Sequence, residues 1–196
     1  MGHPIEHRRF LFFFAAPILL RLALLAHHPV PTPSASDDFA YLLMGDTFSH
    51  FRFANPPHPL NRFFETVFIL QEPSYSSIFP PAQGFALAIG QIFVGQPWAG
   101  ILIVEGLLCA LCYWMLLGWT TRGWATIGAL LAICQFGPLS PWMNNYFGGA
   151  IAGIAGCMVF GALPRYSKEP RLRYALVLGG WGFIPRASVR IDFISG

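Results

Sequence analysis

Long stretches without a charged residue constrain this chain more than any motif does. The 196-residue sequence contains no Asp, Glu, Lys or Arg between Pro73 and Val104, between Gly106 and Thr121, or between Gly123 and Pro164. A helix that crosses a bilayer needs about 20 apolar residues. Charged residues make up 11% of the chain, against about 25% in soluble domains. We therefore expect an all-α, polytopic transmembrane protein.

Prolines and charges divide the chain into expected segments of a single membrane domain over residues 1–196. We expect a first transmembrane helix at about 9–28, an outer loop at about 29–79, and hydrophobic helices at about 82–96, 98–119, 123–137 and 142–163. An incomplete helix follows at about 173–184. In the last stretch, 185–196, Arg186, Arg190 and Asp192 come too early for that helix to span, which predicts a truncated or aberrant end.

The distribution of basic residues predicts the orientation. Arg8 and Arg9 precede the first apolar run, which favours a cytoplasmic N-terminus by the positive-inside rule. The segment at 82–96 is short for a crossing, so we favour an arrangement in which it enters the membrane without crossing it. Arg122 and the basic stretch 165–173 then lie in the cytoplasm, and the acidic loop lies outside. This pattern predicts a multi-pass protein of the bacterial inner membrane.

Two adjacent carboxylates, Asp37 and Asp38, open the outer loop. Ser36 is a good N-cap, so we expect a helix from there to about Phe51 that lies on the membrane surface. Its expected apolar side consists of Phe39, Leu42, Leu43 and Phe51. Acidic residues in a first turn stabilise a helix dipole, but a carboxylate there also suits the acceptance of a proton from a hydroxyl nucleophile. Further along the loop, 61–70 is expected to form a second short helix.

Other polar residues give weaker signals. Arg52 and Arg62 are the arginines of the loop and the candidates for phosphate recognition, because a guanidinium matches phosphate oxygens. Asp46, His50 and His58 match no standard spacing of metal ligands, so no metal site is expected. No dinucleotide or P-loop fingerprint is present, and the absence of a basic stripe argues against nucleic-acid binding. We expect no cofactor.

The four cysteines all lie inside apolar runs, at positions 109, 112, 134 and 157. Buried free cysteine behaves as a small hydrophobic residue. The Cys-x-x-Cys pair at 109 and 112 lacks the strand–helix context of a redox motif. We therefore expect the cysteines to serve in packing.

Two short motifs resemble the GT-C superfamily of integral membrane glycosyltransferases, in particular its protein mannosyltransferase and aminoarabinose transferase members. The run Asp37-Asp38-Phe39-Ala40-Tyr41 resembles their Asp-Glu-x-x-Tyr element, and Phe79-Pro80-Pro81-Ala82 resembles their Pro-Pro element. The likeness extends over about residues 8–165. Asp38 stands where the family has glutamate, and Phe79 stands where it often has a basic residue or histidine.

The resemblance implies transfer of a sugar from a polyprenyl-phosphate donor to an acceptor at the outer membrane face. It implies that Asp37 is the catalytic carboxylate and that Asp38 is its charged neighbour. Arg52 or Arg62 would balance the leaving phosphate, and Tyr41 and Tyr75 would bind the sugar or close the site.

Two other classes of function stay open on the sequence. In a transporter or channel subunit, charges inside the membrane such as Arg21 and Glu105 would mark a pathway. A structural membrane protein is the third possibility, although it gives the long acidic loop no purpose.

Overall fold

The computed structural model describes residues 4–63 and 66–180, and this part of the chain is mostly helical. Its seven α-helices are α1 (Pro4–Ala23), α2 (Ser36–Ser49), α3 (Pro81–Val94), α4 (Trp98–Trp119), α5 (Arg122–Phe136), α6 (Gly149–Lys168) and α7 (Leu172–Gly180). Between α2 and α3 lie a 3₁₀ turn, η1 (Asn61–Phe63), and two strands, β1 (Ile69–Leu70) and β2 (Ser76–Ser77), paired antiparallel.

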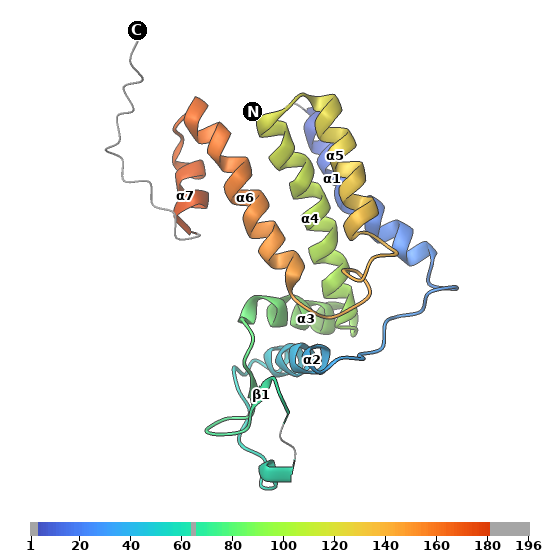
Figure 1. Ribbon diagram of the computed structural model, residues 1–196, viewed down its shortest axis with the longest axis vertical. Coiled ribbons are helices and arrows are strands. Elements are labelled where there is room, and N and C mark those ends of the chain that lie inside the picture. Colours follow the sequence, from blue (N-terminus) through green and yellow to red (C-terminus); the bar gives the residue numbers. More distant parts are fainter. Residues whose placement is uncertain (1–3, 64–65, 181–196) are drawn as a thin grey trace.

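Helix α4 is the centre of the fold. It packs against α1, α5 and α6 along its length and against α3 at its N-terminal end. Helices α2 and α3 pack on each other and lie across one end of this bundle, while α7 folds back along α6 (Figure 1). Within the described residues, α4 and α6 are the two helices that are long and apolar enough to cross a membrane.

Buried side chains form three groups around α4. Phe13, Cys109 and Tyr113 are among the residues that join α1, α4 and α5, and Leu108 and Cys157 belong to the interface of α4 with α6. The third group lies where the bundle meets α2 and α3. It consists of Tyr41, Leu87, Trp98, Ile101, Leu102, Met143 and Tyr146.

Most of the expected helices are present, with shifted ends. The segment expected at 98–119 is α4 itself, and those expected at 82–96 and 123–137 correspond to α3 and α5 within two residues. The first helix begins and ends five residues earlier than expected, and Pro17 lies inside it. The helix expected from 142 begins at Gly149, because 137–148 forms a loop. Of the segment expected at 173–184, residues up to 180 are described; the tail 185–196 lies outside the described residues.

One expectation for the loop was wrong. Instead of a helix over 61–70, the chain forms the turn η1 and then strand β1, whose partner β2 comes from later in the loop. On the side of α2 that is expected to lie on the membrane, Phe39 is 53% exposed, and Phe51, just beyond the helix, is 88% exposed. The buried face of α2 carries Ala40, Tyr41 and Met44.

Glycine explains why that face is the packed one. A Cβ on Gly45 of α2 would lie 2.7 Å from the Cβ of Leu87 on α3, and a Cβ on Gly84 of α3 would lie 2.4 Å from the Cγ of Met44. At each of these points a side chain of one helix packs directly against a glycine of the other. The stacking of Phe48 on Phe85 adds to this contact between α2 and α3.

Candidate functional site

The two motifs of the sequence meet in space at the end of the bundle. The ring of Tyr41, on α2, stacks on the ring of Phe79 just before α3, with centroids 4.4 Å apart and planes inclined by 12°. Tyr41 is buried, and its phenol oxygen is hydrogen-bonded to the backbone of Gly148, just before α6. Three segments far apart in sequence thus converge next to the acidic pair.

Asp38 is a buried structural carboxylate, with 1% of its surface exposed. Its Oδ1 accepts a hydrogen bond from the backbone N–H of Tyr146 (3.0 Å), and its Oδ2 accepts bonds from the N–H groups of Ser34 (3.2 Å) and Ala35 (3.4 Å). Ala35, not Ser36, is the N-cap of α2, so Asp38 supplies the cap that an alanine lacks. One carboxylate therefore fixes both the start of α2 and the loop before α6.

Arg21 anchors the same loop from the other side. This fully buried residue, near the end of α1, donates through Nε to Oδ1 of Asn144 (3.0 Å). Its other nitrogens donate to the backbone carbonyls of His28 (2.8 Å) and Pro29 (2.9 Å), and its guanidinium lies 4.6 Å from the ring centre of Trp98. A buried arginine with its donors satisfied in this way is held in place by structure.

Tyr146 and Gln83 complete this arrangement. The Tyr146 hydroxyl donates to the carbonyl of Pro31 (2.9 Å), and the Gln83 amide on α3 donates to the carbonyl of Tyr146 (3.0 Å). We call Arg21, Asp38, Gln83, Asn144 and Tyr146 the anchor cluster. The sequence signal for this cluster is the polar and aromatic run at 142–146, which lies on the same side as the acidic loop in the favoured orientation.

Asp37 has a different environment from Asp38. It is half-buried, and within the described residues its one hydrogen bond is from the N–H of Asp38 to Oδ1 (3.0 Å). Its Oδ2 is therefore free to accept a hydrogen bond from another molecule. Burial raises the pKa of Tyr41; the hydrogen bond to Gly148 opposes that rise, and the charge of Asp37 adds to it. The phenol stays neutral at ordinary pH.

The other residues assigned by resemblance lie elsewhere. Helix α2 is about 21 Å long at 1.5 Å per residue, and Arg52 follows its far end, exposed to solvent. Tyr75 pairs through its backbone with Asn55, also beyond that far end. The backbone of Arg62 lies in η1, and its side chain lies outside the described part. The structure thus brings Tyr41 next to Asp37 but not Arg52 or Tyr75.

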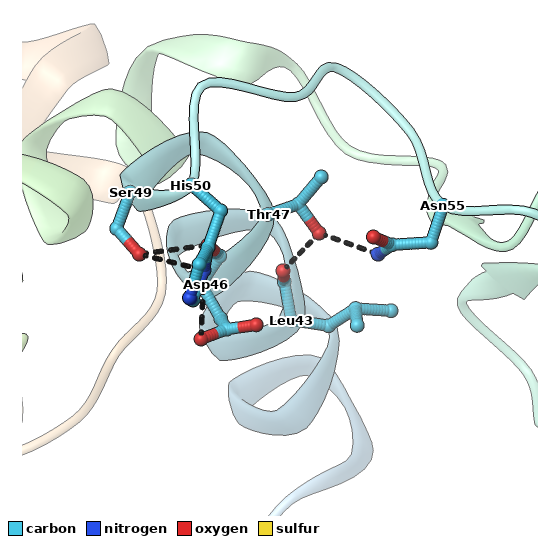
Figure 2. A network of polar contacts seen from close by, with 6 residues as sticks. All are labelled: Leu43, Asp46, Thr47, Ser49, His50 and Asn55. Atoms are coloured by element: carbon cyan, nitrogen blue, oxygen red, sulfur yellow. Dashed lines mark hydrogen bonds and ion pairs between the residues drawn. The ribbon is translucent and has the colours of Figure 1, made fainter.

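The far end of α2 is closed by its own polar network, shown in Figure 2. Thr47 donates to the carbonyl of Leu43 (2.7 Å) and accepts from the amide of Asn55 (2.8 Å). Nδ1 of His50 lies 2.9 Å from the carbonyl of Asp46 and 3.6 Å from its Oδ1. These contacts end the helix and hold the turn that follows. Across the described residues no group of three or more His, Cys, Asp or Glu is arranged to hold a metal ion.

A cavity of about 430 Å³ adjoins the anchor cluster. It lies between the loop after α1 and the loop before α6, and its polar lining includes His28, Ser140, Asn144 and Asn145. Asp37 is not among its lining residues. The amide of Asn144 is already bonded to Arg21 and to the carbonyls at positions 138 and 140.

The charged and thiol groups inside the bundle are packed among helices. Glu105 on α4 is 2% exposed, and its Oε2 has no hydrogen-bond partner in the described part of the chain. The Sγ atoms of Cys112 on α4 and Cys157 on α6 lie 3.7 Å apart as free thiols. Cys109 is buried, whereas Cys134 is exposed on α5, so packing does not account for that cysteine.

Comparisons with protein-family models, curated proteins and solved structures gave no match for this chain. Its function must therefore be argued from the residues themselves.

Proposed function

We propose that this chain is an integral membrane protein with its N-terminus in the cytoplasm and the α2–α3 end at the outer face. Helices α4 and α6 have the length and composition of membrane spans. The outward faces of α1 and α5 support membrane crossing for them as well, because large apolar side chains such as Leu11 (62% exposed) and Leu131 (64% exposed) cover them. Apolar surface of this kind suits lipid rather than water.

The same orientation satisfies the positive-inside rule. Arg122 at the start of α5 pairs with Glu6 near the start of α1 (3.2 Å), and Arg165 contacts Trp114 near the end of α4. Apart from Arg21, the basic residues of α1, α5 and α6 therefore gather at one end of the bundle. Helix α3 lies across the other end, so it need not cross the membrane.

We further propose that the chain takes part in transfer of a sugar from a polyprenyl-phosphate donor to an acceptor hydroxyl, in the inner membrane of a bacterium. The observation that carries this proposal is the difference in hydrogen bonding between the two carboxylates of the acidic pair. Asp38 is fully engaged by backbone N–H groups, while Asp37 keeps an unengaged carboxylate oxygen next to Tyr41. A carboxylate oxygen without another partner is suited to orienting a hydroxyl nucleophile and accepting its proton.

The proposal assigns a binding role to Tyr41 and none to Arg52 or Tyr75. Asp37 lies in the first turn of α2, and Arg52 lies beyond the other end of this helix, which is about 21 Å long. They are too far apart to hold the acceptor hydroxyl and the departing phosphate of one transfer. Arg62 stays a proposed phosphate partner from the resemblance alone, because its side chain lies outside the described residues.

The test is the rate of transfer of labelled sugar from a polyprenyl-phosphate donor, in membranes that contain wild-type or variant chain at equal folded amounts. Asp37→Asn keeps the shape but not the charge, and we expect a loss of at least about 100-fold, the size of a general-base contribution. The matched control is Asp46→Asn, an exposed carboxylate of the same helix, which should transfer at the wild-type rate. Equal rates for wild type and Asp37→Asn would exclude the assigned role.

A transporter is the second candidate, and Glu105 is the observation that favours it. A buried carboxylate with an unpartnered oxygen inside a membrane helix is costly and often lies on an ion pathway. Arg21 does not extend such a pathway, because it is bonded to Asn144 and two carbonyls. Proton flux into liposomes that disappears with Glu105→Gln, while sugar transfer is absent in wild type, would establish this alternative.

A further inference from the structure

A cavity of about 520 Å³ lies at the end of the bundle opposite to the anchor cluster. It is enclosed by the first turns of α1, the last turns of α4, the end of α6, and α7. Its lining includes the charged residues Glu6, Arg165 and Arg173 and the aromatic residues Tyr113, Trp114 and Tyr174. The volume is that of a small-molecule site. No step of the proposed sugar transfer uses it.

Arg165 is held in a fixed position in this cavity. One of its nitrogens donates to the carbonyl of Gly161 (2.6 Å) and another to the carbonyl of Trp114 (2.7 Å). Its guanidinium also lies over the Trp114 ring, 4.2 Å from the centre. A guanidinium has five N–H donors, so donors remain for a ligand after these two bonds.

The cavity is positively charged. Arg173 lies at its rim, exposed, and donates to the hydroxyl of Tyr174 (2.8 Å). Glu6 is the carboxylate of the lining, and it pairs with Arg122 (3.2 Å), which is not a lining residue. The charge of Glu6 also acts on Arg165, but the lining holds two arginines against this one carboxylate, which Arg122 also neutralises.

Tyr113 gives an independent sign of a missing polar partner. It is 1% exposed, lines the cavity, and packs its ring against Phe13 with centroids 4.9 Å apart. Its hydroxyl has no hydrogen-bond partner within the described residues. A buried hydroxyl without a partner costs free energy, and a ligand oxygen reaching the bottom of the cavity would remove that cost.

We propose that this cavity binds the phosphate group of an anionic membrane phospholipid. Arg165 and Arg173 contact the phosphate oxygens, since arginine matches phosphate geometry through paired donors. Tyr113 bonds to a deeper oxygen of the headgroup. Phe10, Trp114 and Leu117 give the cavity an apolar wall, which suits the glycerol and the start of an acyl chain. Basic pockets between membrane helices on the cytoplasmic side are suited to such headgroups.

The experiment measures lipid affinity for the full chain, purified in zwitterionic detergent, by native mass spectrometry. Phosphatidylglycerol, phosphatidylcholine and inorganic phosphate are each titrated. We expect phosphatidylglycerol to bind at least about tenfold more tightly than either alternative, because only it combines net charge with an apolar anchor. Equal retention of phosphatidylcholine, or saturation of the cavity by inorganic phosphate at a similar concentration, would overturn the proposal.

The variants locate the binding. Arg165→Gln also removes a hydrogen bond between α6 and α4. The test therefore rests on Arg173→Gln and Tyr113→Phe, because within the described residues neither side chain makes a hydrogen bond to another helix. We expect each to weaken phosphatidylglycerol binding several-fold, whereas Arg52→Gln at the other end of the molecule leaves it unchanged. Wild-type affinity in both Arg173→Gln and Tyr113→Phe would refute the assignment of these residues.

Discussion

Replacing Asp38 by alanine is expected to destabilise the fold strongly, although the corresponding change at the adjacent Asp37 is not. Asp38 accepts three backbone hydrogen bonds, and its loss leaves the N–H of the buried residue Tyr146 without a partner. The N–H groups of Ser34 and Ala35 belong to exposed residues, so water can replace the carboxylate there.

These contacts determine how much stability each variant is expected to lose. Loss of a helix cap costs about 1 kcal/mol, and a buried unsatisfied donor costs about 1–3 kcal/mol. We therefore expect Asp38→Ala to lower the free energy of unfolding by about 2–4 kcal/mol. Asp37→Ala removes one bond at a half-exposed position, and we expect a loss of about 0.5–1 kcal/mol.

The assay is equilibrium unfolding in mixed micelles, followed by tryptophan fluorescence. Trp98 reports on the relevant region, because its Nε1 donates to the carbonyl of Met143 (2.8 Å) in the loop that Asp38 holds. Equal losses for the alanine variants of Asp37 and Asp38, or wild-type stability for Asp38→Ala, would refute the division of roles between the two carboxylates.

Three further predictions follow from the contacts. Gly45→Ala should lower the free energy of unfolding by about 1–3 kcal/mol, because the added methyl group overpacks the α2–α3 contact. The same unfolding assay measures this loss. The control is Gly156→Ala in α6, where a Cβ meets nothing within 4 Å and no destabilisation is expected. Arg21→Lys should lower the free energy of unfolding by about 2–4 kcal/mol, because an ammonium group cannot satisfy three separated acceptors. Arg52→Lys, at an exposed position, should leave the free energy of unfolding unchanged. Similar losses for the two variants would contradict the anchor role of Arg21. The pKa of Tyr41 is raised above 10.0 in the folded chain, so the contribution of this phenol to stability is complete below that pH and is lost as pH rises through the folded pKa. Tyr41→Phe should therefore lessen the loss of stability at alkaline pH. An alkaline unfolding transition that is the same in wild type and Tyr41→Phe would contradict this contribution.

The sequence predicted the helices well where composition alone decides them. The charge-free runs located α3, α4 and α5 nearly to the residue, because an apolar run bounded by Pro, Gly or a charge leaves few alternatives. The sequence-based prediction of a helix failed over 61–70. Strand β1 in this segment pairs with β2 from later in the loop, and local propensity does not reveal such a pairing. The sequence-based prediction also began the last long helix too early, because hydrogen bonds of Tyr146 to Asp38 and Gln83 hold 142–148 as a loop.

The candidate site was predicted in part. The sequence singled out the acidic pair and the Phe79-Pro80-Pro81 motif, and the stacking of Tyr41 on Phe79 brings them together. The resemblance made Asp37 the catalytic carboxylate and Asp38 its charged neighbour, but it did not indicate that Asp38 is buried and bonded to backbone N–H groups. The sequence indicated a pathway or interface charge at Arg21, although its partners on the loops at 28–29 and 144 make it an anchor. Such long-range partners are set by the packing of helices, which no local pattern encodes.

The side of the membrane on which the α2–α3 end lies tests the central claim most directly, since transfer at the outer face requires Asp37 to be there. In a chain with the exposed Cys134 replaced by serine, Val67→Cys introduces a thiol at a position 77% exposed in the acidic loop, and Ser167→Cys introduces one at an exposed position near the end of α6. We expect an impermeant maleimide to label position 67 in intact cells, and position 167 only after the membrane is opened. Labelling of position 167 but not position 67 in intact cells would contradict the account.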